Sequence, residues 1–180
     1  MENEAITDVH LGSLRVGMPG LSSALGEAYA EAASVCFEQR HVSGVQMTVD
    51  GDCVRIIVVT WDGISDQARR SWADLQNAVE HAAYGVAALL ISVLTEYTIV
   101  AQSCKGTGFD YWLGHKNNPQ PLFQRKARLE VSGILDGSES DIRSRMTRKM
   151  KQTGEGRLPA FVVVVEFGNP RSRVMKRCSK

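Results

Sequence analysis

Hydrophobic residues recur along the chain with two kinds of spacing. Steps of three and four residues predict helices at residues 21–41, 66–94 and 136–154. Short segments rich in β-branched and aromatic residues predict strands at residues 44–49, 53–61, 97–103, 109–114, 127–135 and 160–167. Residues 1–20 contain several Gly and Pro and predict an irregular arm.

Two local motifs predict where a turn and a helix begin. Asp50-Gly51 is a dipeptide that favours two-residue hairpin turns, so it predicts a turn between the first two strands. The hairpin is a candidate either for extending the sheet or for a dimer contact. Ser138 and Asp141 are spaced like a capping box and mark the start of the third helix.

The order of elements predicts the fold class. Residues 160–167 form a nearly continuous β-branched run, which is typical of a strand buried on both faces and parallel to its neighbour across a helical crossover. From residue 66 onward the order is helix, three strands, helix, strand. We therefore expect a single α/β domain over residues 1–180, with a mixed central sheet flanked by helices. Its expected parts are an N-terminal arm, helix and hairpin (1–65), a core (66–168) and a basic tail (169–180).

Charge is distributed unevenly along the chain. Hydrophobic residues make up 43% and charged residues 23%, which is ordinary for a globular protein. The net charge is +1, but residues 1–114 have a balance of −8 and residues 115–180 a balance of +9. A basic C-terminal third indicates either a surface for a polyanion or a solvated basic face.

The composition argues against several other classes of protein. The four cysteines are scattered without a C-x-x-C motif, so a structural zinc site is not expected and the thiols are expected to be reduced, as in a cytoplasmic protein. The N-terminal residues are acidic and do not resemble a signal peptide. The apolar stretch at residues 85–94 is too short to span a bilayer, so no membrane association is expected.

Acidic residues on neighbouring elements predict a metal site. Asp110 follows a Gly-rich turn in one short strand, and Glu130 lies in the middle of the next strand. If these strands pair as a hairpin, the two carboxylates come within reach of one Mg²⁺ or Mn²⁺ ion, which prefers oxygen ligands. Glu80, on the long apolar helix, is a third carboxylate that can approach the same place.

Each acid also has a structural interpretation, which the residues alone leave open. Asp110 is placed to cap the Gly-rich turn. Glu130 is placed to form an ion pair with Arg128 or with an arginine of the following helix. Glu80 is placed to be a solvated helix residue.

The order of elements and the placement of the acids resemble the PD-(D/E)XK nuclease superfamily, which has the restriction-endonuclease-like fold. The resemblance covers about residues 66–168. It implies that Asp110 begins the metal site, that Glu130 is the second acid and that Glu80 is the acid often contributed by the first core helix. The family's lysine, two residues after the second acid, would fall on Ser132, where this sequence departs from the pattern.

Some members of that superfamily take the lysine from a neighbouring element instead. At 100° per residue, Lys149 lies about 20° from Ile142 on the third helix, at the edge of the apolar stripe that faces the sheet. We therefore expect Lys149 to replace the missing lysine, with Lys105 in the Gly-rich turn as the second candidate. Gln152 resembles the polar residue that several members carry on this helix.

Several further residues are candidates for binding nucleic acid. Tyr111 and Trp112 are candidates either for stacking on a base or for the hydrophobic core. The basic residues near the site and in the C-terminal tail, together with Gln152, are candidate contacts to nucleic acid, and binding through phosphates would be salt-sensitive and independent of sequence. These candidates are Lys105, Arg145, Gln152, Arg171 and Arg173.

The predicted function is metal-dependent hydrolysis of nucleic-acid phosphodiester bonds, with Asp110, Glu130 and Lys149 as catalytic residues. The resemblance implies DNA more than RNA as the substrate, in a phage-defence or mobile-element context, with a homodimer or a partner subunit as a further expectation. The alternative is a catalytically inactive subunit with the nuclease fold that binds nucleic acid or a partner protein. A scaffold that contacts only proteins is a third hypothesis.

Overall fold

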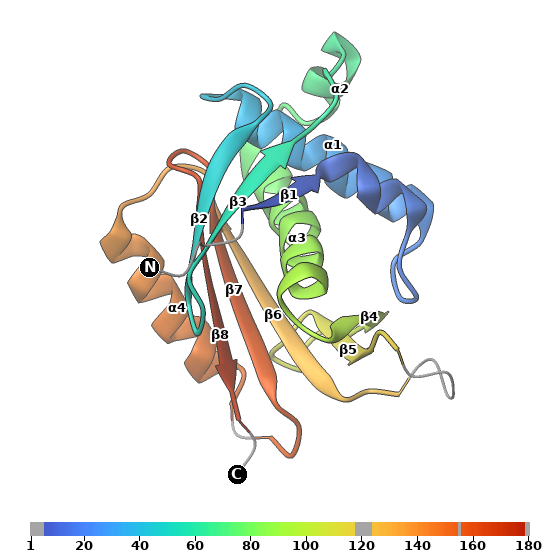
Figure 1. Cartoon of the computed structure of the whole chain (residues 1–180), viewed down its shortest axis with the longest axis vertical. Helices are drawn as coiled ribbons and strands as arrows, with labels where there is room; N and C mark the ends of the chain where they lie inside the picture. The colour runs from blue at the N-terminus through green and yellow to red at the C-terminus, as the bar shows by residue number, and fades with distance from the viewer. Residues whose placement is uncertain (1–5, 118–123, 155, 179–180) are drawn as a thin grey trace.

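The computed structural model describes residues 6–117, 124–154 and 156–178. The protein is an α/β protein with one eight-stranded mixed sheet packed against helices (Figure 1). The sheet has the strand order β1-β3-β2-β8-β7-β6-β5-β4, so the predicted class of fold is confirmed.

The N-terminal elements form three strands at one edge of this sheet and part of its cover. Strand β1 spans Thr7–His10, and the 3₁₀ helix η1 spans Leu11–Val16, so the first twenty residues are not an irregular arm throughout. Helix α1 spans Ser23–Glu38. Its N-cap is Ser22, whose side chain accepts a hydrogen bond from the backbone N–H of Leu25. This N-cap satisfies one of the free donors in the first turn.

The predicted hairpin is present, and it extends the sheet. Strand β2 spans Val45–Gly51 and pairs antiparallel with β3, Arg55–Thr60. The predicted turn at Asp50-Gly51 is wrong, because both residues lie inside β2 and pair with β8. Gly51 has a φ of +113°, and a Cβ there would lie 2.1 Å from the carbonyl oxygen of Val174. Glycine therefore permits close packing between strands here.

The single helix predicted at residues 66–94 is two helices. Helix α2 spans Asp66–Ser71 and α3 spans Leu75–Leu94. Asp74 caps α3 by accepting hydrogen bonds from the backbone N–H groups of Gln76 and Asn77. An N-cap residue has non-helical backbone angles, and this is why the helix restarts at that point.

Helix α3 is longer than the apolar stretch considered from the sequence. Its 20 residues are long and apolar enough to cross a membrane by length and composition alone. Its most apolar window is 61% buried inside the protein, because α3 packs between the sheet and α1. This burial is typical of the core helix of a globular domain.

The second half of the chain follows the predicted order of elements. The strands and helix that follow α3 are β4 (Tyr97–Gln102), β5 (Tyr111–His115), β6 (Ala127–Ile134), α4 (Glu139–Gln152) and β7 (Ala160–Glu166). Strands β4, β5 and β6 form an antiparallel meander, and β6 pairs in parallel with β7 across α4. The predicted capping box of Ser138 and Asp141 is present at the start of α4.

The predicted basic tail is a strand in the middle of the sheet. Strand β8 spans Arg171–Arg177 and lies between β7 and β2, with Val174 opposite Val163. Arg171 and Arg173 alternate with the buried Ser172 and Val174, and the four basic residues of β8 make it resemble a solvated basic tail in the sequence. Strand β8 therefore joins the N-terminal hairpin to the core and is not a solvated terminus.

Two hydrophobic layers hold the helices on opposite faces of the sheet (Figure 1). On one face, α1 and α3 pack on residues that include Val163 and Val165. On the other face, Ile142 and Met146 of α4 pack on Val162 and Val164. Both faces of β7 are covered, which explains why this strand is apolar from residue 160 to residue 165.

A charge placed in β8 should disrupt the sheet. We expect Val174→Asp to destabilise the fold by about 3 kcal/mol or more, because it buries an unpaired carboxylate between β2 and β7. The exposed Val54 provides a matched control, and Val54→Asp should change stability by less than about 0.5 kcal/mol. Urea unfolding followed by circular dichroism measures both, and equal midpoints for the two variants would contradict the central position of β8.

Candidate functional site

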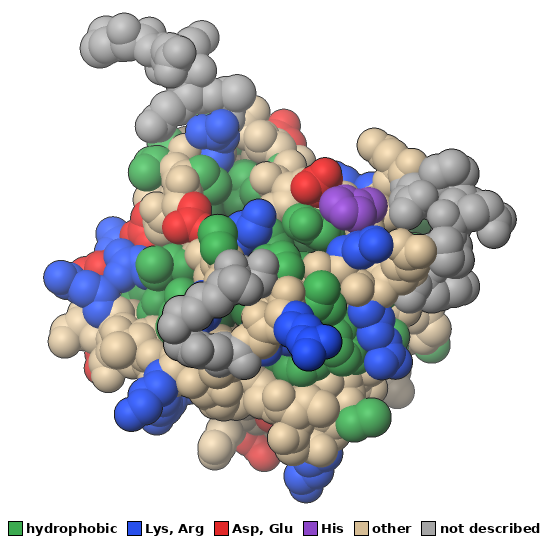
Figure 2. Space-filling model, turned by 90° about the horizontal axis from the view of Figure 1, so that it is seen from below, with side chains coloured by type: hydrophobic (Ala, Val, Ile, Leu, Met, Phe, Trp, Pro, Cys, Tyr) green, Lys and Arg blue, Asp and Glu red, His purple; other side chains and the backbone are tan. Residues whose placement is uncertain are grey.

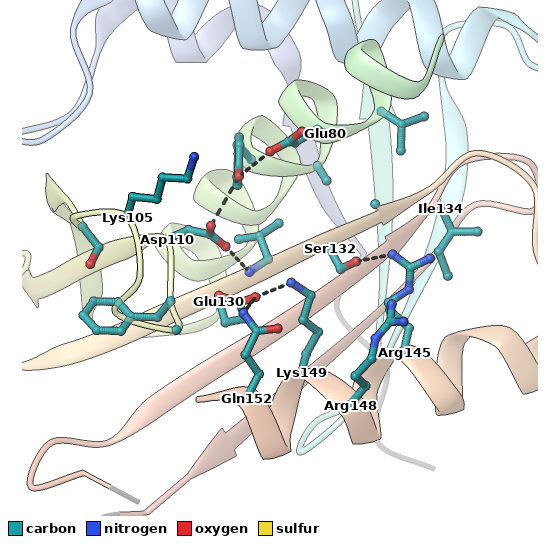
Figure 3. Close-up of a pocket in the computed structure, with 18 of the residues that line it drawn as sticks. Glu80, Lys105, Asp110, Glu130, Ser132, Ile134, Arg145, Arg148, Lys149 and Gln152 are labelled. Atoms are coloured by element: carbon teal, nitrogen blue, oxygen red, sulfur yellow. Dashed lines mark hydrogen bonds and ion pairs between the residues drawn. The ribbon is translucent and has the colours of Figure 1, made fainter. Parts of the chain in front are cut away.

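A cleft with a volume of about 1160 Å³ opens between α3 and α4 (Figure 3). Its walls are the first half of α3, the loop between β4 and β5, the second half of β6, and α4. The cleft exists because β5 is short. It pairs with β6 only along Ala127–Leu129, so in the described part of the chain the segment of β6 from Glu130 onward has no strand neighbour on that side.

Asp110 lies where β5 begins and the cleft opens. It precedes β5 by one residue and is therefore not inside the strand, as the sequence had suggested. Its backbone N–H already donates to the carbonyl oxygen of Leu129 at 2.8 Å. Its side-chain Oδ2 then accepts a hydrogen bond from the backbone N–H of Val131 at 2.8 Å. The carboxylate thus occupies the place that a further residue of β5 would take, and does not merely cap the Gly-rich turn.

Glu130 projects from β6 toward α4 and is 1% exposed. Its Oε1 accepts hydrogen bonds from Lys149 Nζ and from Gln152 Nε2, the latter at 3.2 Å (Figure 3). Arg128 donates instead to the backbone carbonyls of Thr153 and Leu158, so it is not the partner of Glu130. Helix α4 therefore supplies the two side chains that donate hydrogen bonds to this carboxylate.

The carboxyl groups of Asp110 and Glu130 are close enough to influence each other's pKa. Burial raises the pKa of Glu130 to about 7; contact with Lys149 works against this shift, and the charge of Asp110 adds to it. Burial also raises the pKa of Asp110, against the opposite effects of the Val131 N–H and of Lys149. Two neighbouring buried carboxylates therefore favour a shared proton or a bound cation over two unbalanced negative charges.

Helix α4 supplies cations to this pair. Lys149 reaches Glu130, as its position on the helix predicts. Arg145 donates to Ser132 Oγ at 3.0 Å. Burial lowers the pKa of the Arg145 guanidinium, which nevertheless stays charged because arginine is so basic. Arg148 is exposed and lines the same wall of the cleft.

Glu80 approaches the pair through Tyr84 and does not touch it directly. The Tyr84 hydroxyl lies 3.1 Å from Glu80 Oε1 and 3.3 Å from Asp110 Oδ1. Among residues 6–117, 124–154 and 156–178, no group of three or more His, Cys, Asp or Glu side chains is arranged to hold a metal ion. A cation at this site would therefore have Asp110 and Glu130 as its carboxylate ligands.

The other predicted contacts to nucleic acid divide into two groups. Lys105 lines the cleft from the loop between β4 and β5. Arg171 pairs with Glu139, and Arg173 pairs with both Asp50 and Glu139. These two arginines lie on β8 and do not line the cleft. Their role in the structure is to join β8 to β2 and α4.

Three residues of the cleft were not singled out as site residues from the sequence. Tyr84 follows Glu80 by four residues on α3, and this i, i+4 spacing could have indicated their contact. Arg148 precedes Lys149 directly on α4, and the structure shows that it lines the cleft. Phe109 precedes Asp110, and only the structure shows that it enters the cleft wall.

The raised pKa of Glu130 predicts how stability depends on pH without added metal. A glutamate has an ordinary pKa of 4.5, and that of Glu130 in the fold is about 7. Between these values the folded protein holds more protons than the unfolded one, so its stability falls as pH rises from about 4.5 through 7. In EDTA, we expect the melting temperature to fall over this range, and to fall less in Glu130→Gln.

The exposed Asp66 offers a control for this measurement, since Asp66→Asn should keep the slope of the wild type. Differential scanning fluorimetry at half-unit steps of pH measures all three proteins. Parallel pH profiles for Glu130→Gln and the wild type would show that Glu130 is not the titrating group.

Comparisons with protein-family models, with curated proteins and with solved structures found no match. Function therefore has to be inferred from the chemistry of the cleft.

Proposed function

We propose that this chain is a metal-dependent nuclease that hydrolyses phosphodiester bonds, with DNA as the substrate that the resemblance implies. The observation that supports this proposal most strongly is the contact of Lys149 with Glu130, beside Asp110. Two carboxylates and a lysine are the groups that such a reaction requires, and here three separate elements bring them together.

The arrangement of elements supports a restriction-endonuclease-like core as the finer description of the fold. Helix α3, strands β4, β5 and β6, helix α4 and strand β7 follow one another in the order that the resemblance implies. Asp110 lies directly before β5 and Glu130 inside β6, so the two acids come from adjacent parts of the meander. The N-terminal hairpin and β8 are additions to that core.

The residues present fit a hard divalent cation. Mg²⁺ is commonly bound through one or two carboxylates and keeps several waters. Asp110 and Glu130 supply two neighbouring carboxylates, and burial raises the pKa of each despite the positive charge of Lys149. When bound, Mg²⁺ or Mn²⁺ supplies a water of lowered pKa and neutralises negative charge on the phosphate.

The remaining groups of the cleft have separate roles in this proposal. Lys149 orients the attacking water and stabilises the charge that develops on the phosphate, as a preorganised donor in a buried site. Gln152 holds the carboxylate of Glu130 in place through its amide. Arg145 and Arg148 bind phosphates of the substrate strand, and Lys105 does so from the opposite wall. Tyr84 fixes the orientation of Asp110.

One observation favours the alternative of an inactive subunit that only binds. Lys149 already pairs with Glu130, and no third carboxylate, histidine or cysteine joins the site within the described residues. A lysine in this place can substitute for the metal as the balancing charge. Such a protein would keep a basic cleft for nucleic acid and would cut nothing.

Cleavage of plasmid and single-stranded DNA with Mg²⁺ or Mn²⁺ tests the proposed catalytic roles. We expect Asp110→Asn and Glu130→Gln to abolish metal-dependent cutting, because they remove the cation ligands. We expect Lys149→Ala to slow it by about 10²- to 10³-fold, the usual effect of removing one preorganised donor to the transition state.

Lys151 provides the matched control on the same helix, because it is exposed and does not line the cleft. Lys151→Ala should cut at close to the wild-type rate. Equal losses in the Lys149 and Lys151 variants, or an active Asp110→Asn, would contradict the assigned roles. A wild type that binds DNA but cuts neither substrate would favour the inactive subunit.

Metal binding itself can be measured without any cleavage. If the dissociation constant is about 1 mM, 10 mM Mg²⁺ should stabilise the fold by about 1.4 kcal/mol at pH 8. For a domain of this size, this raises the melting temperature by roughly 3–6 °C. The shift should vanish in Asp110→Asn and persist in Asp66→Asn, with NaCl matching the ionic strength. The same shift in both variants would place the cation elsewhere.

A further inference from the structure

Two aromatic side chains stand beside the carboxylate pair without being part of the core. Phe109 lines the cleft directly before Asp110, and the ring centroid of Trp112 lies 4.6 Å from that of Phe109, at an interplanar angle of 79°. Both side chains are half-buried. Tyr111, by contrast, is 1% exposed and contacts the hydroxyl of Tyr29 in the core. Tyr111 is therefore excluded as a stacking residue, and Trp112 stays a candidate.

Trp112 lies on the same face of the sheet as Glu130. It stands directly opposite Arg128 on β6, and Arg128 and Glu130 are two residues apart on that strand. Side chains two residues apart in a strand share a face. The indole and the buried carboxylate therefore lie on the same side of the sheet.

A cation lies over the indole. The guanidinium carbon of Arg125 is 4.7 Å from the centroid of the Trp112 ring, and the Arg125 side chain is exposed. Among the described residues, no carboxylate forms an ion pair with Arg125. Figure 2, which looks at the molecule from the lower end of Figure 1, shows several Lys and Arg side chains beside hydrophobic ones on this face, with fewer acidic ones. An aromatic pair with an exposed arginine over one ring matches a negatively charged ligand that has a flat ring.

We propose that Phe109, Trp112 and Arg125 form a platform that binds one unpaired nucleobase of the substrate strand. The inference rests on the proposed function for the position of the phosphate at Asp110 and Glu130. Stacking of a base on an aromatic ring is stronger than an exposed cation–π contact. An incoming base therefore displaces the Arg125 guanidinium, which is then available to a phosphate of the same strand.

The platform specifies the class of substrate. In an intact duplex the faces of a base are covered by its neighbours, so a ring at the side of the helix meets only edges and phosphates. In a single strand each base can unstack from its neighbours and offer its face to an aromatic side chain. The cleft is therefore expected to take a single-stranded segment, with one base on Trp112 and the adjacent phosphate at the carboxylate pair.

Binding in EDTA tests the platform separately from catalysis. The probes are a 15-nucleotide single strand that carries 2-aminopurine and a blunt duplex of the same sequence. Trp112→Leu should weaken single-strand binding by about tenfold, the usual effect of removing one stacking ring. Trp112→Phe should restore most of the affinity, because it keeps an aromatic face. Duplex binding should be the same in all three proteins.

Arg125→Gln and Arg143→Gln form a matched pair of exposed arginines, one at the platform and one on α4, where it pairs with Glu139. Arg125→Gln should weaken single-strand binding more than Arg143→Gln does. A Trp112→Leu protein with a wild-type melting temperature and wild-type affinity for the single strand would overturn the platform. Absence of any binding by the wild type, or a preference for the duplex, would overturn it as well.

Cleavage in Mg²⁺ separates this inference from the proposed function. If the wild type cuts nothing but loses single-strand binding in Trp112→Leu, the platform is supported and the nuclease proposal fails. If the wild type cuts while Trp112→Leu binds and cuts the single strand equally well, the nuclease proposal is supported and the platform is wrong.

Discussion

A buried carboxylate costs several kcal/mol unless its charge is balanced, and Glu130 is such a carboxylate in the middle of the sheet. Its surroundings compensate only in part, because its pKa is still raised to about 7 with Lys149 in contact. The C-terminal end of α4 must therefore lie over β6, where Lys149 and Gln152 reach the carboxylate. This requirement links the crossover from β6 to β7 with the chemistry of the cleft.

The short length of β5 is the second structural feature on which the cleft depends. Because β5 begins after Asp110, the backbone of β6 is open from Glu130 onward, and the Asp110 carboxylate takes the place of a strand neighbour for Val131. The same interruption makes room for the cleft, with Arg145 on one side of the acids and Phe109 on the other. A simple change of strand length thus yields acids, cations and aromatic rings at one place.

The sequence predicted best what depends on local spacing. The capping box of Ser138 set the start of α4, and helical geometry then gave the direction of Lys149 correctly. The predictions from the sequence failed where contacts between distant segments determine the structure. In the sequence, Gly51 is typical of a turn, but in the structure it permits close packing with β8. Strand β8 resembles a basic tail in the sequence, because the acidic partners of Arg171 and Arg173 lie far away in the chain. The contact of Tyr84 with Asp110 likewise joins two separate elements.

Anomalous diffraction from a crystal soaked in Mn²⁺ tests the central claim, that Asp110 and Glu130 together hold a divalent cation, most directly. The account predicts one strong peak about 2 Å from an oxygen of each carboxylate, with Lys149 still within reach of Glu130. A map without a peak between the two carboxylates, in a crystal that binds Mn²⁺ at other positions, would contradict it. Lys149 would then be the permanent balancing charge of a protein that binds without cutting.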